Sequence, residues 1–279
     1  MSARGCVCAL VLLLGGLPGL AQEPAPSPAG KEQEEEALRR ETGQLLAQVV
    51  ERTTRPLAEE AELELTVSIQ GRPFDRAARV EVSWRAAAEG QPEALRVRFR
   101  EPPALQDYAW LQVWEEGRAS CWQWTPGRPR VERVQPLPDA WRLAGSGLTL
   151  GQLRGERAAA WRWRLIGEEL REGGVRLHLL EALPLPAGEG PAGEVDFPGA
   201  ARRLLRVEAE RRLPLEVEWQ DAQGQTLARA RLGDWQALRR RLRPFAREVR
   251  EPDRVTRVRA TLRRGEAPRA HFAPDAFWR

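Results

Sequence analysis

A period of two, repeated along most of the chain, limits what this sequence can fold into more than any other feature. In Leu95–Arg100, apolar residues alternate with three arginines. The same alternation recurs in segments such as Leu63–Ile69, Val80–Trp84 and Leu215–Trp219. Because successive side chains of a strand point to opposite faces, each segment predicts a strand with one apolar and one polar face. About eleven such strands are expected along the chain.

Short turns join these segments, which is typical of an antiparallel meander. In Leu95–Val134, the run Glu101-Pro102-Pro103 ends one strand, because proline has no N–H to give to a ladder. Gly117 and Gly127 suit the turns that follow. So many strands in one sheet must twist and curl. We therefore predict an α+β fold that is mainly β, a strongly curved antiparallel sheet forming an open half-barrel. A two-sheet sandwich is the alternative.

Glu34–Arg52 is the one long segment with helical spacing of apolar residues. Its acidic run at 34–36 lies in the first turn, where it suits the helix dipole. The apolar stripe consists of Leu38, Leu45, Leu46 and Val49. Such a stripe needs an apolar partner, and the sheet provides one. We expect this helix, and a short helix entered from the loop Gly145–Leu153, to lie across the concave face of the sheet.

The first residues predict export. Arg4 gives a positive start, Val7–Leu20 is apolar, and small residues precede a plausible cleavage before Gln22. The apolar run is shorter than the ~20 residues of a membrane span, although an uncleaved anchor is the alternative. We divide the chain into a signal peptide (1–21), a disordered proline-rich linker (22–33) and one half-barrel domain (34–279). The expected location is the periplasm.

Cysteine and charge counts exclude several classes of protein. Without residues 1–21, Cys121 is the one cysteine left, so the domain must rely on its core and not on a disulfide. The net charge of +4 comes from 44 basic and 40 acidic residues, and the arginines mostly alternate with apolar residues. This pattern indicates a solvated sheet face with cross-strand ion pairs. We expect a monomer that binds no nucleic acid, since that would need clustered charge.

No pattern for catalysis or metal binding is present in the sequence. The two histidines, His178 and His271, are far apart, and the glutamates are evenly spread. There is no HExxH, CxxC, acidic calcium loop or glycine-rich phosphate loop, and Gly145-Ser146-Gly147 is not the elbow of a hydrolase. We expect no enzyme, no cofactor and no metal site. A hydrolase that assembles its residues from distant strands is the alternative, which turnover of lipid esters would reveal.

Tryptophan is unusually frequent, with eleven residues, and all but Trp235 and Trp278 fall on or beside expected strands. Most of these rings suit a core, in which each buries ~150–250 Å². A curved sheet covered by one long helix, however, has more apolar concave face than that helix can fill. Binding sites for apolar ligands are concave and lined by such residues. We predict that the wall of an apolar cavity contains Trp84, Phe99, Trp122, Trp124, Trp161, Trp163 and Trp219.

Several weak motifs occur in a characteristic order. An opening helix is followed by a break at Phe99-Arg100-Glu101-Pro102, a strand with Trp122-Gln123-Trp124-Thr125-Pro126, a basic strand (128–133) and a Gly-Ser loop. The closing features are a hairpin with Leu213, Pro214, Val217, Asp221 and Gly224, and an aromatic tail, Phe272–Phe277. This order resembles the periplasmic outer-membrane lipoprotein-sorting proteins of the LolA-like type. The chain departs from that family in its loop, where Gly147, Gly151 and Gln152 replace the usual acidic residues.

The resemblance implies an open barrel with a helical lid that holds acyl chains of a lipoprotein or another lipid for transfer toward the outer membrane, without chemistry. It also implies membrane donor and acceptor proteins and transient contact with a membrane surface. The alternative is an envelope sensor or adaptor that uses the same barrel to bind a protein partner. Its docking patch would be Arg239–Arg243, a run that is otherwise interpreted as a solvated face.

Overall fold

The computed structural model describes residues 28–278 apart from positions 71, 89–90, 129, 156, 187–195 and 240. The chain divides into two compact units, Met1–Glu36 and Ala37–Arg279, and every described strand belongs to the second. The expected signal peptide (1–21) lies outside the described residues.

The described strands form one sheet of 13 strands. Their bounds are β1 (Ala58–Ile69), β2 (Arg72–Arg85), β3 (Glu93–Glu101), β4 (Ala109–Glu115), β5 (Arg118–Trp124), β6 (Glu132–Val134), β7 (Trp161–Leu170), β8 (Arg176–Pro184), β9 (Arg202–Glu208), β10 (Leu213–Gln220), β11 (Thr226–Leu238), β12 (Arg241–Arg250) and β13 (Arg254–Arg264). The helices are α1 (Pro28–Thr54) and α2 (Leu150–Arg154), with 3₁₀ turns at Pro103–Leu105, Leu143–Gly145, Ala158–Ala160 and Arg269–Phe272.

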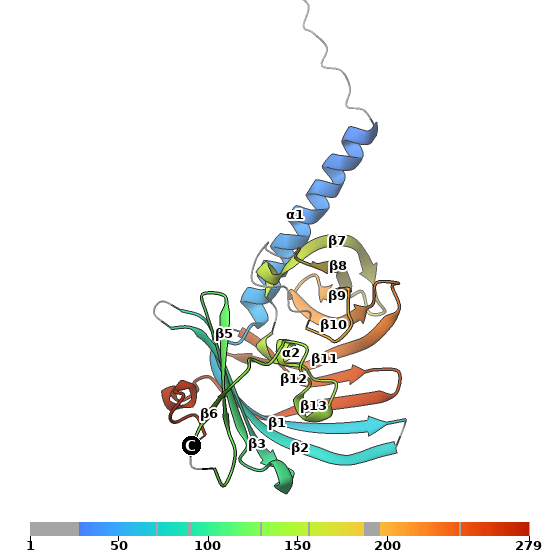
Figure 1. The fold of residues 1–279 in the computed structure, drawn as a ribbon. Helices are drawn as coiled ribbons and strands as arrows, with labels where there is room; N and C mark the ends of the chain where they lie inside the picture. The colour runs from blue at the N-terminus through green and yellow to red at the C-terminus, as the bar shows by residue number, and fades with distance from the viewer. Residues whose placement is uncertain are drawn as a thin grey trace, which may run out of the picture. The chain divides into compact units, whose positions relative to one another are not determined.

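The sheet order is β6-β5-β4-β3-β2-β1-β13-β12-β11-β10-β9-β8-β7. From β1 to β6, and again from β7 to β13, each strand therefore pairs with the next one in sequence. An antiparallel β1–β13 pair joins these two halves of the sheet. The edge strands β6 and β7 do not pair with each other in the described chain, so the sheet is open. Figure 1 shows this sheet curving around α2. The expected mainly β, antiparallel fold is confirmed, and the single sheet excludes the sandwich alternative.

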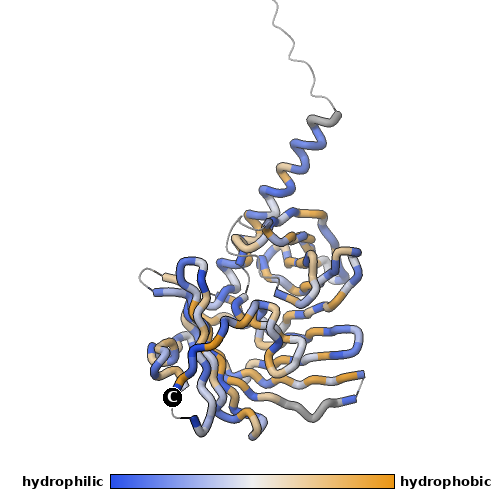
Figure 2. The backbone as a smooth tube through the Cα atoms, viewed as in Figure 1, coloured by the Kyte–Doolittle hydropathy of each residue, from blue (hydrophilic) through white to orange (hydrophobic). Residues whose placement is uncertain are grey.

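The strand that the alternation did not reveal is β12. Its arginine-rich sequence contains Pro244, which argues against a central strand. The structure accommodates this proline because β12 pairs with β13 only over Ala246–Arg250, leaving Pro244 outside that ladder. Elsewhere Figure 2 shows apolar residues recurring along the strands, as the period of two requires. The count of 13 strands thus exceeds the expected number of about eleven.

Helix α1 is longer at both ends than the expected helix (34–52). It begins at Pro28, so residues 28–33, which the sequence assigned to the linker, belong to it. Proline is tolerated in the first turn of a helix, where its missing N–H has no intrahelical acceptor. The helix ends at Thr54 because Pro56 disfavours a helical conformation in the residue before it.

The face of α1 that packs on the sheet includes only part of the expected leucine stripe, in which Leu46 packs against the core. Leu38 and Leu45 are 62% and 54% exposed, whereas Ala47 and Val50 are buried in the core. Gly43 lies against β7 so closely that a Cβ there would meet Arg164 Cα at 2.7 Å. Small residues therefore let the helix backbone approach the strand, which the larger leucines could not do.

The two faces of the sheet carry different apolar clusters. Leu148, Leu150 and Leu153, from α2 and the loop before it, pack on one face against residues including Val97 and Phe99 of β3. We call this the inner face. The opposite, outer face of β3–β5 carries Ala94, Ala109 and Leu111, which the C-terminal tail covers with Phe272 and Phe277. Apolar side chains are thus buried on both faces of this half of the sheet.

Candidate ligand cavity

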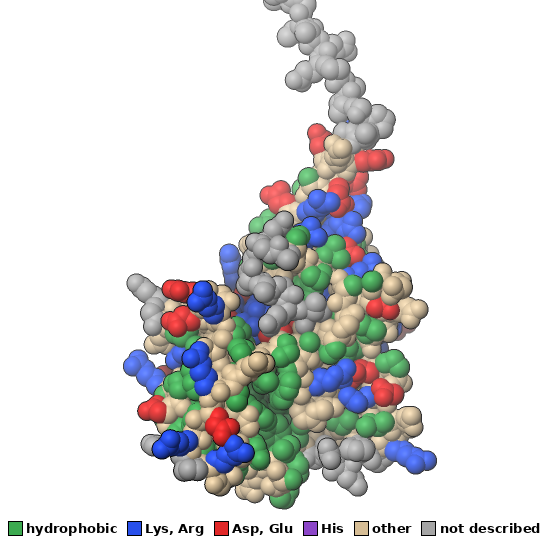
Figure 3. Space-filling model, in the orientation of Figure 1, with side chains coloured by type: hydrophobic (Ala, Val, Ile, Leu, Met, Phe, Trp, Pro, Cys, Tyr) green, Lys and Arg blue, Asp and Glu red, His purple; other side chains and the backbone are tan. Residues whose placement is uncertain are grey.

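A cavity lies on the inner face, between α2 and strands β10–β13. About 80 Å³ of it is wide enough to admit the centre of a water-sized sphere. Its apolar lining includes Leu63, Trp84, Val217, Trp219, Leu232, Phe245, Val258 and Ala260. Figure 3 shows hydrophobic side chains gathered in a hollowed band on the face of the molecule that carries α2. The cavity is therefore small, mainly apolar, and closed on one side by a short helix.

Two tryptophans on strands β2 and β10 are fixed in the cavity wall. Trp84 is 5% exposed, and its Nε1 donates to the carbonyl oxygen of Leu153 in α2. Trp219 is 2% exposed, and its Nε1 donates to Asp196 Oδ1 at 2.9 Å. Because each indole N–H is paired, the ring faces are left for apolar contact.

The cavity is covered by residues 145–155, which we call the lid segment. Thr149 caps α2, accepting from the amide of Gln152, while its own hydroxyl donates to Asp196 O at 2.6 Å. Gly151 is required here, since a Cβ would meet Asp196 Cβ at 2.7 Å and Asp139 Cβ at 3.1 Å. The glycine that departs from the family pattern is therefore explained by a close approach. The short helix expected after the Gly-Ser loop is confirmed.

Arginines form the polar part of the lining. Arg243 Nε and Arg263 Nη1 both donate to Glu59 Oε1, at 2.9 and 3.0 Å. Burial and the neighbouring charge of Arg243 together lower the pKa of Arg263 to about 10. Arg247 Nη1 donates to Gln152 Oε1 at 3.3 Å, which ties β12 to the lid segment. No local pattern in the sequence indicates this polar cluster, because its members come from strands far apart in the chain.

The proposed docking patch Arg239–Arg243 is not one surface in the described residues. Arg243 is buried in the cavity lining, whereas Arg239 is exposed and pairs with Glu266 at 3.2 Å. Arg241 Nη1 donates to the carbonyl oxygen of Glu51 at the end of α1. Position 240 lies outside the described residues. These arginines therefore serve different parts of the fold.

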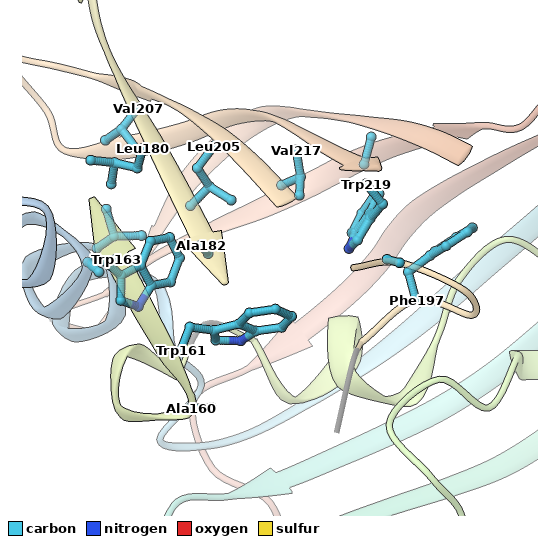
Figure 4. Close-up of a cluster of buried hydrophobic side chains, with 14 of the residues drawn as sticks. Ala160, Trp161, Trp163, Leu180, Ala182, Phe197, Leu205, Val207, Val217 and Trp219 are labelled. Atoms are coloured by element: carbon cyan, nitrogen blue, oxygen red, sulfur yellow. The ribbon is translucent and has the colours of Figure 1, made fainter. Parts of the chain in front are cut away.

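The seven residues expected in the cavity wall fall into four groups. Trp84 and Trp219 line the cavity. Trp161 and Trp163 are buried beside it in the same apolar cluster as Trp219, as Figure 4 shows. Phe99 is on the inner face but packs edge-to-face against Trp110, with ring centroids 5.4 Å apart. The ligand-binding role of all of them stays a prediction.

Trp122 and Trp124 lie on the outer face. The register pairs them with Leu111 and Ala109, whose side chains belong to the cluster under the C-terminal tail. Trp124 stacks on Trp278 of that tail with ring centroids 5.4 Å apart. The structure therefore does not bring these two tryptophans to the cavity. Their spacing of two correctly predicts a shared face, but not that this face is covered by the tail.

A serine, a histidine and a glutamate meet on the outer face without forming a catalytic triad. His271 Nδ1 lies 3.1 Å from Ser83 Oγ and 3.0 Å from Glu60 Oε2. A triad histidine uses one ring nitrogen for the nucleophile and the other for the acid, whereas both contacts here involve Nδ1. Burial also raises the pKa of Cys121 to about 11, which keeps its thiol protonated.

Two further searches of the described residues give negative results. No group of three or more His, Cys, Asp or Glu side chains there could hold a metal ion. No described helix combines the length and the apolar character needed to cross a membrane.

Comparisons with known proteins give a fold but no sequence match. No family model and no curated protein sequence matches this chain. A putative outer membrane lipoprotein-sorting protein domain from Vibrio parahaemolyticus is 18% identical, with a TM-score of 0.69 over 86% of this chain and 100% of that one. A DUF1329 family protein from Desulfovibrio piger is 15% identical, with a TM-score of 0.70 over 84% and 97% of the two chains. A LolA superfamily protein from Nitrosomonas europaea is 15% identical, with a TM-score of 0.64 over 83% and 97%. The resemblance to the lipoprotein-sorting family is thus confirmed at the level of the fold.

Proposed function

We propose that this chain is an exported, periplasmic carrier that holds acyl chains of a lipoprotein or another lipid and delivers them toward the outer membrane without chemistry. The observation that supports this most is the cavity on the inner face, walled by Trp84 and Trp219 and closed by the lid segment. The fold shared with an outer membrane lipoprotein-sorting domain is consistent with it. Donor and acceptor proteins, and transient contact with a membrane, complete the proposed cycle.

The hydrophobic effect supplies the affinity that a carrier needs. Each buried CH₂ contributes ~0.8 kcal/mol, so ten of them contribute about 8 kcal/mol, from which the costs of association and of opening the lid segment are subtracted. The open volume of about 80 Å³ is below the roughly 300 Å³ at the lower end of ligand pockets. The lid segment therefore has to move away from the sheet as cargo enters.

Opening of the lid segment has to break its attachments to the rest of the domain. The bonds that attach it to the sheet and to Asp196 include those from Trp84 to Leu153 and from Thr149 to Asp196. A further bond joins Arg247 to Gln152. At roughly 1 kcal/mol net for each hydrogen bond, these three contribute about 3 kcal/mol to the cost of opening, and the ion pair of Arg154 with Glu93 at 3.0 Å adds to it. Phe99, Trp161 and Trp163 would join the wall once the lid segment has opened.

A substitution that fills the cavity tests the proposal. Ala260 is 7% exposed and lines the cavity, so Ala260→Leu places extra volume where an acyl chain would lie. Ala237→Leu, at an exposed position of β11, is the matched control. We expect a fluorescent acyl probe to bind the control as it binds the wild type and to bind Ala260→Leu at least about tenfold more weakly. Equal binding by all three proteins, with unfolding transitions retained, contradicts an acyl site in this cavity.

A further inference from the structure

The polar side of the cavity has more cationic groups than anionic ones. Four arginines line it, Arg203, Arg243, Arg247 and Arg263, together with one carboxylate, that of Asp196. Asp196 is paired with Arg203 at 2.7 Å. Arg243 and Arg263 must share the single carboxylate of Glu59, and both contact the same oxygen of it. Two buried cations beside one anion leave local positive charge, which is costly in a protein interior unless an anion balances it.

Hydrogen-bond donors without acceptors gather at the same cavity. Within the described residues, Gln152 Nε2, Trp235 Nε1 and Arg263 Nε are buried and have no hydrogen-bond partner. All three residues line the cavity. The Gln152 residue is 8% exposed and the Arg263 side chain 7%. Buried polar atoms are normally paired, and these three are all donors. What the cavity lacks is therefore an acceptor.

The cationic side joins the apolar wall directly. The Arg263 guanidinium lies 5.7 Å from the ring centroid of Trp84 and 5.3 Å from that of Phe245. These rings and Trp219 belong to the same lining as the three unpaired donors. A ligand that occupies this lining thus meets cationic donors at one part and apolar rings at another. That arrangement suits an amphiphile.

We propose that the cavity binds a single-chain anionic amphiphile, with its carboxylate or phosphate at Arg263, Gln152 and Trp235 and its chain along Trp84 and Trp219. The small open volume favours one chain over two. This inference rests on the proposed function and narrows its cargo, because a neutral acyl ester leaves the shared cations unbalanced. The anion accepts the hydrogen bonds that the donors lack, so the head, and not only the chain, determines affinity.

A titration of tryptophan fluorescence separates the head from the chain. The mature, delipidated protein is titrated with palmitate, with hexadecyl phosphate and with methyl palmitate, each below the concentration at which it aggregates. We expect at least one of the two anions to bind about tenfold or more tightly than the ester, since charge-assisted hydrogen bonds are the strong ones. The tighter of the two anions identifies the head. Equal affinity for the ester and both anions overturns the inference but leaves an acyl carrier intact.

Two substitutions test the assigned residues. Arg263→Met keeps the apolar stem, and Glu59 keeps Arg243 as a partner, so no buried carboxylate is left unpaired; an unfolding transition checks that the variant folds. We expect this variant to lose the preference for the anion over the ester. Glu59→Gln removes the competing carboxylate and should tighten anion binding. Arg257→Met, whose side chain is 59% exposed on β13, is the control and should behave as the wild type.

The remaining outcomes each decide a separate question. Retention of the anion preference by Arg263→Met, or weaker anion binding by Glu59→Gln in a folded protein, overturns the assignment to this cluster. If inorganic phosphate binds as tightly as hexadecyl phosphate, the ligand is not an amphiphile, because the alkyl chain then contributes nothing to the affinity. Failure of all three amphiphiles to bind refutes the proposed function itself.

Discussion

Replacement of Gly151 by alanine tests the seating of the lid segment. A Cβ at this position would meet Asp196 Cβ at 2.7 Å, Asp139 Cβ at 3.1 Å and Asp196 Cα at 3.2 Å. A contact below 3.0 Å forces a shift, and Asp196 cannot move freely, because it accepts hydrogen bonds from Thr149 and Trp219. The shift therefore has to come from α2. Overpacking of this kind costs roughly 1–3 kcal/mol.

Amide hydrogen exchange measures that cost directly. The amides of Leu153 and Gly155 donate within the lid segment, to Thr149 O and Gly151 O. A loss of roughly 1–3 kcal/mol corresponds to exchange about 5- to 150-fold faster at these amides, while the strands should exchange as in the wild type. Gly233→Ala is the control, since nothing lies within 4 Å of a Cβ there. Unchanged exchange in Gly151→Ala would refute the tight seating of α2.

Three further predictions concern single side chains. Trp84→Phe leaves the carbonyl of Leu153 without its donor and should lower the free energy of unfolding by about 1–3 kcal/mol in urea titrations; an unchanged midpoint contradicts the pairing. Burial and the nearby Arg96 lower the pKa of His271 to about 4. The unfolded state then binds more protons between this value and ~6.5, so stability should fall as the pH drops through that window, by up to about 3 kcal/mol, and His271→Gln should lack this fall. Because burial raises the pKa of Cys121 to about 11, thiol reagents at pH 8 should modify it only after unfolding, and rapid modification of the native protein would contradict its burial.

The period of two predicts most of the sheet, but neither β12 nor the helix face that packs on the sheet. Alternation in segments such as Val80–Trp84 determines which side chains of the strand are buried, because a register shifted by one residue would bury the charged ones. In α1 the spacing of leucines predicts a stripe in which Leu38, Leu45 and Val49 are exposed and Leu46 alone packs against the core. Gly43 and Ala47 complete the contact, since what decides helix packing here is close backbone approach and not side-chain size. A hydrophobic pattern does not contain that information.

The candidate site was predictable only in its apolar part. Trp84 and Trp219 follow from alternation, which correctly predicts a shared inner face. The same reasoning cannot tell which face of β5 is inner, so it also selected Trp122, which the C-terminal tail covers. The cationic cluster around Glu59 depends on the pairing of β1 with β13 and on Arg243 of β12, the strand that the pattern missed. Long-range pairing of this kind leaves no local signal.

The central claim, that the chain carries an acylated cargo, is tested most directly by native mass spectrometry with organic extraction. The protein is purified from its native host without detergent and measured intact and after denaturation. The account predicts a bound acylated species that is released only on denaturation, and an anionic one if the cationic cluster is its head site. A clean apo mass, with no uptake of added lipid and no quenching of tryptophan fluorescence, would contradict the carrier and leave the inner face as a filled core.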